Sequence, residues 1–294
     1  MRYPILLHAN YCEDGQPLDT LFKLAHDVKA DGVELRRSRK DFPDPNTYLE
    51  EVARLRDRYR MEWLVIGGIG PNLTLPSEAD RRREIESTIT LHCSAANRLG
   101  VKLFNVLTGW IQHPDSSIDY LQVEYHGSTA VTPAGWQWQV DGLRQLAKGA
   151  EENGVTIGLE THSCYVHDLP GPTAELLRQV DSPNVGALLD YANYMLFRQR
   201  PTIEEALHTL KGRIVYTHLK NLIILENGQR VLTSLSAGQV NNRKLLAGLL
   251  ASGYRGPFCI EAPRRGDGEW FAREDIEYLR HLLASLSPSP TPNA

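Results

Sequence analysis

Short apolar runs alternate with longer segments of helical periodicity along almost all of the 294-residue chain. One such pair recurs about every 30 residues, which is the size of a strand–helix unit. The runs that we expect to form strands are residues 3–9, 32–36, 61–67, 101–107, 155–161, 185–190, 213–219 and 257–262. Strict alternation of strand and helix predicts parallel strands, and eight of them favour an α/β fold closed into a single (β/α)₈ TIM barrel.

The segments between these runs carry apolar residues at the i, i+3, i+4, i+7 spacing of an amphipathic helix. The clearest are residues 18–30, 46–59, 78–99, 136–153 and 242–252. Several strands follow a glycine that we expect to end the preceding helix in the left-handed conformation. These glycines are Gly32, Gly100, Gly154 and Gly253. An open doubly wound sheet is the alternative fold, but no GxGxxG motif opens the first helix.

One barrel domain is expected to occupy residues 1–286. The composition supports a large core without disulfides, since 41% of the residues are hydrophobic and 23% are charged. Residues 287–294 alternate serine and proline, so we expect a disordered tail there. The four cysteines lie far apart and form no CxxC pair, which favours reduced thiols in a cytoplasmic protein.

The charge balance and the apolar runs limit the classes of partner. A formal net charge of −4 supplies no broad positive field, which disfavours nucleic acid as a partner. No run approaches the roughly 20 apolar residues of a membrane helix, and the N-terminal residues lack the pattern of a signal peptide.

One connection is much longer than the others. Residues 108–133 separate the fourth strand from its helix, and long loops within compact domains are usually functional or disordered. This loop carries Trp110, Tyr120 and Tyr125, which a disordered linker seldom contains. We expect the loop to cover the mouth of the barrel as a lid, with Trp110 near the substrate. A contact between subunits is the alternative.

Four consecutive strands end in an ionisable residue. TIGLE ends at Glu160, GALLD at Asp190, IVYTH at His218 and FCIE at Glu261. Reactive groups of such barrels lie where strands end and the following loops begin. Each residue follows several apolar ones, and a buried charge without a partner costs several kcal/mol, a cost that a shared cation removes. Three carboxylates and one imidazole suit Mn²⁺ or Mg²⁺, and can also hold Zn²⁺ or Co²⁺.

Each of these residues, taken alone, has a plainer explanation. A carboxylate at a strand end can cap a helix or pair with a neighbouring base, and a histidine can be satisfied within the core. The occurrence of the pattern at the ends of four consecutive strands favours one shared divalent metal ion.

The order of these four residues, with VELR at the second strand, ETH at the fifth and THLKN at the seventh, resembles the xylose-isomerase-like superfamily of sugar isomerases and epimerases. The resemblance covers roughly residues 3–285. It implies that Glu160 and Glu261 are catalytic as well as metal ligands, one removing a proton from a substrate carbon and the other returning it on the opposite face. Relatives are often dimers or tetramers, so a homo-oligomer is one option for this chain.

The implied reaction has a clear physical requirement. Removing a proton beside a carbonyl is difficult because the enolate is a strong base, and a cation that chelates both oxygens stabilises the developing charge. We therefore expect an isomerase or epimerase that acts on a small sugar or polyol-derived carbonyl compound through a metal-stabilised enediolate.

Two further residues are candidate catalytic groups. His162 and Lys220 each lie two residues beyond a candidate ligand, so their side chains should point to the same face as Glu160 and His218, respectively. We expect them to polarise or protonate the substrate. The alternatives are a hydrogen bond from His162 to a loop and an ion pair between Lys220 and a neighbouring acid.

Other residues are candidates for contact with the substrate. Glu34 and Arg36 end the second strand, where the resemblance implies a polar wall; a salt bridge between strands is equally plausible. His8 at the end of the first strand and Asn105 within the fourth are weaker candidates. Asn193 stands where many relatives carry the histidine of a DxxH pattern, and it can bond a hydroxyl but cannot exchange protons.

Three other functions are alternatives for a barrel of this kind. The DNA-repair endonuclease branch of the superfamily needs additional histidines on strands three, four and six and a DxH pair after strand seven, which this chain lacks. A metal-dependent dehydratase of the inosose or dehydroshikimate type also begins with proton removal beside a carbonyl, and remains the runner-up as a lyase. A non-catalytic binding barrel has no reason to keep four buried charges.

Overall fold

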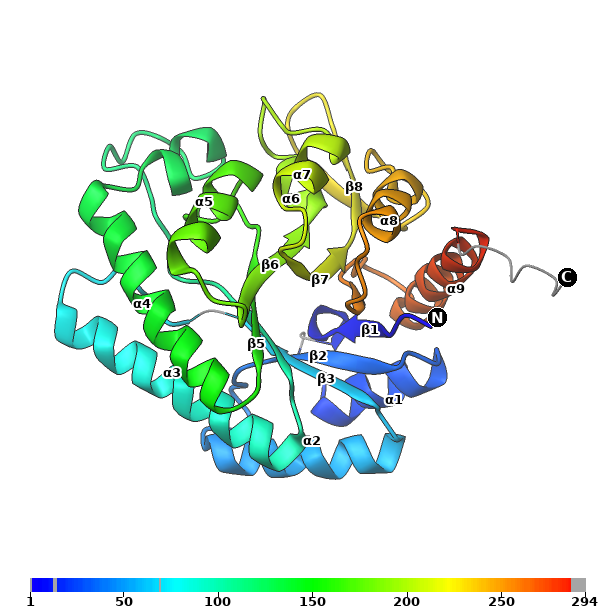
Figure 1. Ribbon diagram of the computed structural model, residues 1–294. Coiled ribbons are helices and arrows are strands. Elements are labelled where there is room, and N and C mark those ends of the chain that lie inside the picture. The colour runs from blue at the N-terminus through cyan, green and yellow to red at the C-terminus, as the bar shows by residue number, and fades with distance from the viewer. Residues whose placement is uncertain (1, 13–14, 69, 287–294) are drawn as a thin grey trace, which may run out of the picture.

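The centre of the protein is a closed barrel of parallel strands in the order β1-β10-β7-β6-β5-β4-β3-β2 (Figure 1). The computed structural model describes residues 2–12, 15–68 and 70–286. The barrel strands are β1 (Ile5–His8), β2 (Gly32–Arg36), β3 (Trp63–Gly67), β4 (Leu103–Val106), β5 (Thr156–Glu160), β6 (Val185–Asp190), β7 (Ile214–Leu219) and β10 (Phe258–Ile260). The predicted (β/α)₈ fold is confirmed, and each predicted strand has its counterpart.

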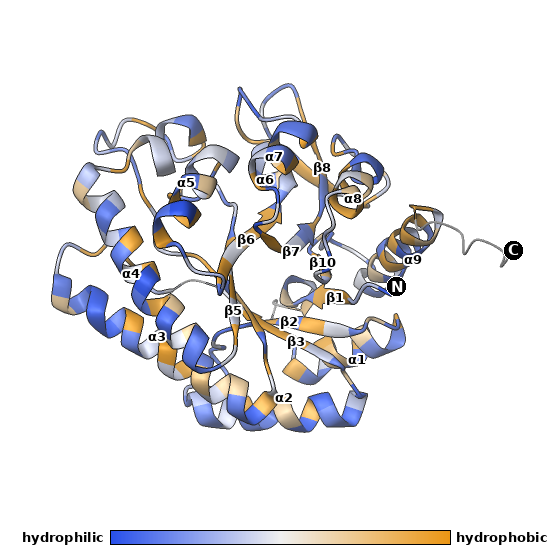
Figure 2. Ribbon diagram, in the orientation of Figure 1, coloured by the Kyte–Doolittle hydropathy of each residue, from blue (hydrophilic) through white to orange (hydrophobic). Residues whose placement is uncertain are grey.

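Helices surround the barrel and connect its strands (Figure 1). They are α1 (Leu18–Asp27), α2 (Pro45–Tyr59), α3 (Glu78–Leu99), α4 (Pro133–Glu152), α5 (Pro170–Val180), α6 (Tyr191–Tyr194), α7 (Ile203–Thr209), α8 (Asn242–Ala251) and α9 (Gly268–Leu286). Figure 2 shows the outer helices banded in hydrophilic and hydrophobic colours, as expected of elements that bury one face against the strands.

Three of the four glycines predicted to be left-handed are so, and the fourth prediction is wrong. Gly100, Gly154 and Gly253 have φ values of +67°, +60° and +87°. Gly32 instead begins strand β2, and Lys29 takes the left-handed conformation with φ of 62°. Glycine is required at position 32 for another reason, because a Cβ there would lie 2.0 Å from the carbonyl oxygen of Trp63 on the neighbouring strand.

An antiparallel hairpin that the sequence analysis did not predict follows β7. It consists of β8 (Asn221–Ile224) and β9 (Arg230–Thr233), which pair only with each other. An Asn-Gly pair at positions 227 and 228 lies between the two apolar runs, and that combination is a strong hairpin signal. The hairpin starts directly after β7 ends, so it lies at the end of the barrel where the carboxyl ends of the strands meet.

The long connection after β4 is held in place by hydrogen bonds to the segment after β5. Between β4 and α4 it contains only short 3₁₀ turns at Val123–Tyr125 and Gly127–Thr129. The Ile111 amide donates to the Cys164 carbonyl at 2.8 Å, and the Ser128 amide donates to an Asp168 carboxylate oxygen at 3.0 Å.

The sequence also led to expectations about the C-terminal tail, the cysteines and membrane helices. The predicted tail, 287–294, lies outside the described residues, so the tail and the domain boundary at residue 286 stay predictions. All four cysteines are free thiols. Within the described residues, no helix has both the length and the apolar character needed to cross a bilayer.

Candidate metal centre

The side chains at the ends of β5, β6, β7 and β10 converge on one point. Each contributes one potential ligand atom, and these atoms all lie within 4.8 Å of one another. The residues are Glu160, Asp190, His218 and Glu261. The first three are buried and Glu261 is partly exposed. The structure therefore brings together the four residues that the sequence analysis selected.

The two-residue period of the strands explains this convergence. Side chains two positions apart point to the same side of a strand. A layer of apolar side chains and one tyrosine packs together inside the barrel: Leu6, Val65, Leu103, Leu188, Tyr216 and Cys259. Two positions further along five of these strands lie the polar side chains of the site: His8, Asn105, Asp190, His218 and Glu261. The apolar layer fills the barrel beneath the site, and the polar layer lies above it, next to the loops that follow the strands.

The charges of the site fit a divalent cation. The site contains the carboxylates of Glu34, Glu160, Asp190 and Glu261 and the ammonium group of Lys220. Lys220 Nζ lies 2.6 Å from Asp190 Oδ2 and 3.1 Å from Glu261 Oε2. Asp190, Glu261 and His218 offer the hard oxygen and imidazole ligands that a divalent cation prefers.

The carboxylates of the site raise the pKa values of its two basic residues, His218 and Lys220, and so favour their protonated forms. Burial alone would lower the pKa of His218, but the nearby carboxylates of Glu34 and Glu261 raise it well above its ordinary value. Burial would likewise lower the pKa of Lys220, and Asp190 and Glu261 raise it instead. The pKa of Asp190 is raised chiefly by burial, because Lys220 only partly offsets the loss of hydration.

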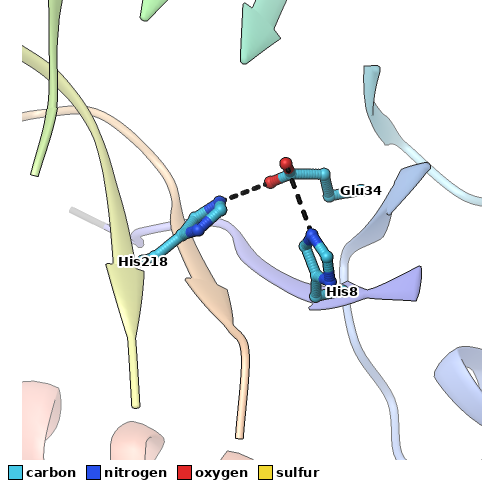
Figure 3. Close-up of side chains that lie close together, drawn as sticks. All are labelled: His8, Glu34 and His218. Carbon is cyan, nitrogen blue, oxygen red and sulfur yellow. Dashed lines mark hydrogen bonds and ion pairs between the residues drawn. The ribbon is translucent and has the colours of Figure 1, made fainter. Parts of the chain in front are cut away.

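Glu34 does not form the predicted polar wall, because it is fully buried beneath the site. Its carboxylate lies between the imidazole rings of His218 and His8 (Figure 3). Burial alone would raise the pKa of Glu34, but His218 and His8 hold it well below its ordinary value. His8, predicted to contact substrate, is also buried. Its Nδ1 accepts a hydrogen bond from the backbone N–H of Asn10 at 3.1 Å.

Three amide side chains hold the carboxylates in place. Asn105 Nδ2 donates to Glu34 Oε1 and Glu160 Oε2, both at 2.9 Å. Asn10 Nδ2 donates to Glu261 Oε1 at 2.7 Å. The third amide is that of Asn193.

Asn193 uses its amide hydrogens within the protein. Its Nδ2 donates to the Thr161 carbonyl at 2.9 Å and to Asp190 Oδ2 at 3.1 Å. Asn193 therefore steadies Asp190, and only its amide oxygen remains for the predicted contact with substrate. Asn10, Asn105 and Asn193 thus orient four different carboxylates.

A cavity of about 700 Å³ lies beside the cluster, over the ends of β2 to β5. It brings together three residues predicted for the substrate region, Arg36, Trp110 and His162, with Tyr165 as a further aromatic wall. Trp110 is 51% exposed, so this part of the long loop borders the cavity without sealing it. The Arg36 guanidinium also donates to Asn10 Oδ1, which links the cavity wall to Glu261 through one side chain.

Two histidines after β5 have different roles. His162 Nδ1 contacts the Ser163 carbonyl at 2.9 Å, which requires a proton on Nδ1 and leaves the Nε2 lone pair of the neutral ring available. His167, which the sequence analysis missed, is fully buried and its Nδ1 donates to the Glu160 carbonyl at 2.6 Å. Its Nε2 then accepts from the Thr108 hydroxyl at 3.1 Å, so His167 ties the backbone of Glu160 to the start of the long loop.

Asp168 anchors the long loop and carries a buried carboxylate. Oδ2 accepts from the Ser128 amide, while Oδ1 is buried without a hydrogen-bond partner among the described residues. Burial raises the pKa of Asp168 to about 7, against the lowering effect of Ser128. Because the folded state holds this proton more tightly than the unfolded chain, the residue destabilises the fold progressively as the pH rises from about 4 to about 7.

We expect Asp168→Asn to stabilise the protein at alkaline pH. The amide oxygen can still accept from Ser128, and the cost of a buried negative charge disappears. The free energy of unfolding should rise by roughly 2–4 kcal/mol at pH 8, with a smaller gain at pH 5. Urea unfolding at both pH values measures this, with the exposed Asp57→Asn as the control. An equal change at the two pH values would show that titration of Asp168 is not the cause.

Comparison with known families identifies the chain. A family model described as xylose isomerase-like TIM barrel matches residues 22–282. The chain belongs to this family. The resemblance inferred from the strand-end residues is therefore confirmed.

Members of the xylose isomerase-like family with solved structures share the fold at low sequence identity. One is a xylose isomerase-like TIM barrel protein from Mycobacterium smegmatis in complex with magnesium, at a TM-score of 0.76 and 18% identity, with 97% of each chain covered. Another is D-psicose 3-epimerase from Clostridium cellulolyticum H10 with D-tagatose, at a TM-score of 0.75 and 17% identity, covering 95% of this chain and 99% of that one.

A curated relative matches part of the chain. It is a 3-dehydroshikimate dehydratase from Pseudomonas putida, 28% identical in an alignment of 132 residues that covers 42% of this chain. The chain spans about a fifth of the length of that relative, since the match covers 20% of it.

Proposed function

We propose that this protein is a divalent-metal-dependent isomerase or epimerase that acts on a small sugar or polyol-derived carbonyl compound. The observation that carries the proposal is the convergence of four ligand atoms, within 4.8 Å of one another, at the mouth of the barrel. Mn²⁺ and Mg²⁺ suit this set of three carboxylates and one imidazole best. The magnesium complex of the structural neighbour from Mycobacterium smegmatis supports a divalent ion.

Bound at this site, a divalent cation supplies electrostatic stabilisation of the negative charge that develops on the substrate oxygens during proton removal. The two glutamates come from the outer two of four consecutive strands, β5 and β10, with Asp190 and His218 between them. They can therefore approach a substrate carbon from opposite sides. Glu160 takes the proton beside the carbonyl, and Glu261 gives a proton to the opposite face or to the neighbouring carbon.

The remaining polar residues orient the substrate. The positive charge of Lys220 lies against Asp190 and Glu261 and is available to a substrate hydroxyl or carbonyl oxygen. His162 and Arg36 border the 700 Å³ cavity, where they can bond the hydroxyls of the substrate remote from the reacting carbon. Trp110 and Tyr165 give that cavity an aromatic wall, and the loop that carries Trp110 would limit the access of water to the reaction.

A metal-dependent dehydratase is the second candidate function. The partial match to a 3-dehydroshikimate dehydratase supports it. After the same proton removal, the carbon–oxygen bond beta to the carbonyl breaks, and a general acid protonates the departing hydroxide to give water. A protonated His162 or the ammonium of Lys220 would serve as that acid.

Incubation with candidate carbonyl substrates in D₂O separates the two reactions. An isomerase or epimerase produces an isomer of the substrate, with solvent deuterium incorporated at carbon wherever the removed proton exchanges with solvent. A dehydratase gives a product that has lost one water. Mass spectrometry and proton NMR read both outcomes, and a substrate panel that shows neither exchange nor conversion, with Mn²⁺ bound, would count against both functions.

A further inference from the structure

Glu34 is a buried carboxylate of the site that accepts three hydrogen bonds from the protein. It is fully buried, and its Oε2 accepts from His218 Nε2 and from the Tyr216 hydroxyl, each at 2.7 Å. Its Oε1 accepts from Asn105 at 2.9 Å and lies 3.6 Å from His8 Nε2. Both oxygens thus have partners within the protein, so Glu34 faces the protein rather than the substrate.

The contact with His218 determines where that ring carries its proton. A carboxylate accepts hydrogen bonds, so the 2.7 Å approach of Nε2 requires hydrogen on that nitrogen. The neutral ring then has its lone pair on Nδ1. That nitrogen lies 3.1 Å from Glu261 Oε2 and 3.9 Å from Glu160 Oε1. Two carboxylate oxygens facing Nδ1 call for positive charge there, which a proton on Nδ1 supplies in the metal-free protein and a metal ion would supply in its place.

We propose that Glu34 is a positioning residue that fixes the tautomer and the direction of His218, so that Nδ1 binds the metal ion; this inference rests on the metal site proposed above. Figure 3 shows the arrangement, with Glu34 from β2 reaching across to the ring of His218 on β7. Such a carboxylate behind a ligating imidazole makes the imidazole a stronger ligand and holds its plane.

The reach of Glu34 extends to a second ligand. Asn105 donates to Glu34 and to Glu160 through the same amide nitrogen, so the position of Glu34 also determines the position of Glu160 Oε2. One buried carboxylate on β2 thus holds two of the four proposed ligands, which come from β5 and β7. Replacement of Glu34 should therefore weaken metal binding more than replacement of one of the donors around it.

The experiment compares Mn²⁺ binding to wild type, Glu34→Gln and Tyr216→Phe by titration calorimetry after chelation and dialysis. Glu34→Gln keeps the size of the side chain but turns an N–H toward one pair of donors, and its Kd should rise by about 10–100-fold. Tyr216→Phe removes a donor to the same oxygen without touching the His218 proton, so its Kd should stay within about threefold. Melting of the metal-free proteins shows whether each variant is folded.

The outcomes separate this inference from the metal site itself. If wild type binds no Mn²⁺, the proposed site fails and the inference fails with it. If wild type binds one ion and Glu34→Gln binds it equally well, or both variants weaken it equally, only the role of Glu34 is refuted. Two ions per wild-type chain would also refute it, because His8, Glu34 and His218 would then form a second metal site.

A measurement on wild type tests the same inference if Glu34→Gln does not fold. Nitrogen-15 NMR of histidine-labelled protein loaded with Mg²⁺ distinguishes a protonated ring nitrogen from a bare one. We expect His218 to carry its proton on Nε2. A bare Nε2 with the proton on Nδ1 would overturn the proposal.

Discussion

Glu160→Gln and Glu261→Gln should each reduce turnover by about a thousandfold, because a neutral amide keeps the size of the side chain but cannot take or return a proton. The two residues lie on strands at opposite ends of the ligand set, so in the proposed mechanism each acts on its own side of the substrate carbon and neither replaces the other. Turnover is measured with the substrate found in the D₂O experiment, at Mn²⁺ concentrations that saturate each variant.

Saturation with metal matters because both residues are also proposed ligands. Circular dichroism and melting temperature establish that the variants are folded, and Glu175→Gln on the exposed surface of α5 provides the matched control. Glu175 pairs with Arg178 far from the strand ends, and its replacement should leave kcat within about twofold. A Glu160 or Glu261 variant that keeps kcat within about tenfold of wild type would remove that residue from proton transfer.

The barrel could be predicted because its signal is repeated. Two strands, 32–36 and 185–190, agree residue for residue with the sequence interpretation, since each is a mostly apolar, buried run that ends at a charged residue. The β8–β9 hairpin was missed because it interrupts the alternation of strand and helix. Its Asn-Gly turn was readable, but it had no place in a pattern of parallel strands.

The proposed ligands could be selected from the sequence because their position on a strand determines their position in space. The residues that orient them could not be selected in this way. Glu34 meets His218 across the barrel, 184 positions along the chain, and their contact depends on the stagger of strands that are not neighbours. The sequence places Glu34 near the end of its strand but does not show how deeply its side chain is buried. From the sequence alone, a residue that lines the substrate pocket cannot be distinguished from a buried partner of His218.

The same limit applies to the amide groups. Asn10 follows β1 in a 3₁₀ turn whose course decides that its amide reaches Glu261. His162 and His167 both follow the same strand, and only the path of the loop assigns one to the cavity and the other to the backbone of Glu160. Hydrogen-bond partners set by loop geometry have no periodic signal in the sequence.

Removal of the metal ion should abolish turnover and lower the melting temperature. The buried carboxylates around Asp190 lose their main counter-charge, and a ligand that binds only the folded state stabilises it by mass action. At Mn²⁺ about 100-fold above Kd the gain is about 2.7 kcal/mol, which corresponds to about 5 °C for a chain of this size. Melting curves with EDTA and with Mn²⁺ measure the shift.

Asp190→Asn is the variant that connects this shift to the proposed site. Asp190 is fully buried and contributes one of the converging ligand atoms, so the amide should weaken Mn²⁺ binding and shrink the metal-induced rise in melting temperature. Glu175→Gln should keep the full shift, because its exposed carboxylate lies outside the cluster. If Asp190→Asn retained the wild-type shift, the ion would be binding elsewhere and the convergence of the four side chains would need another explanation.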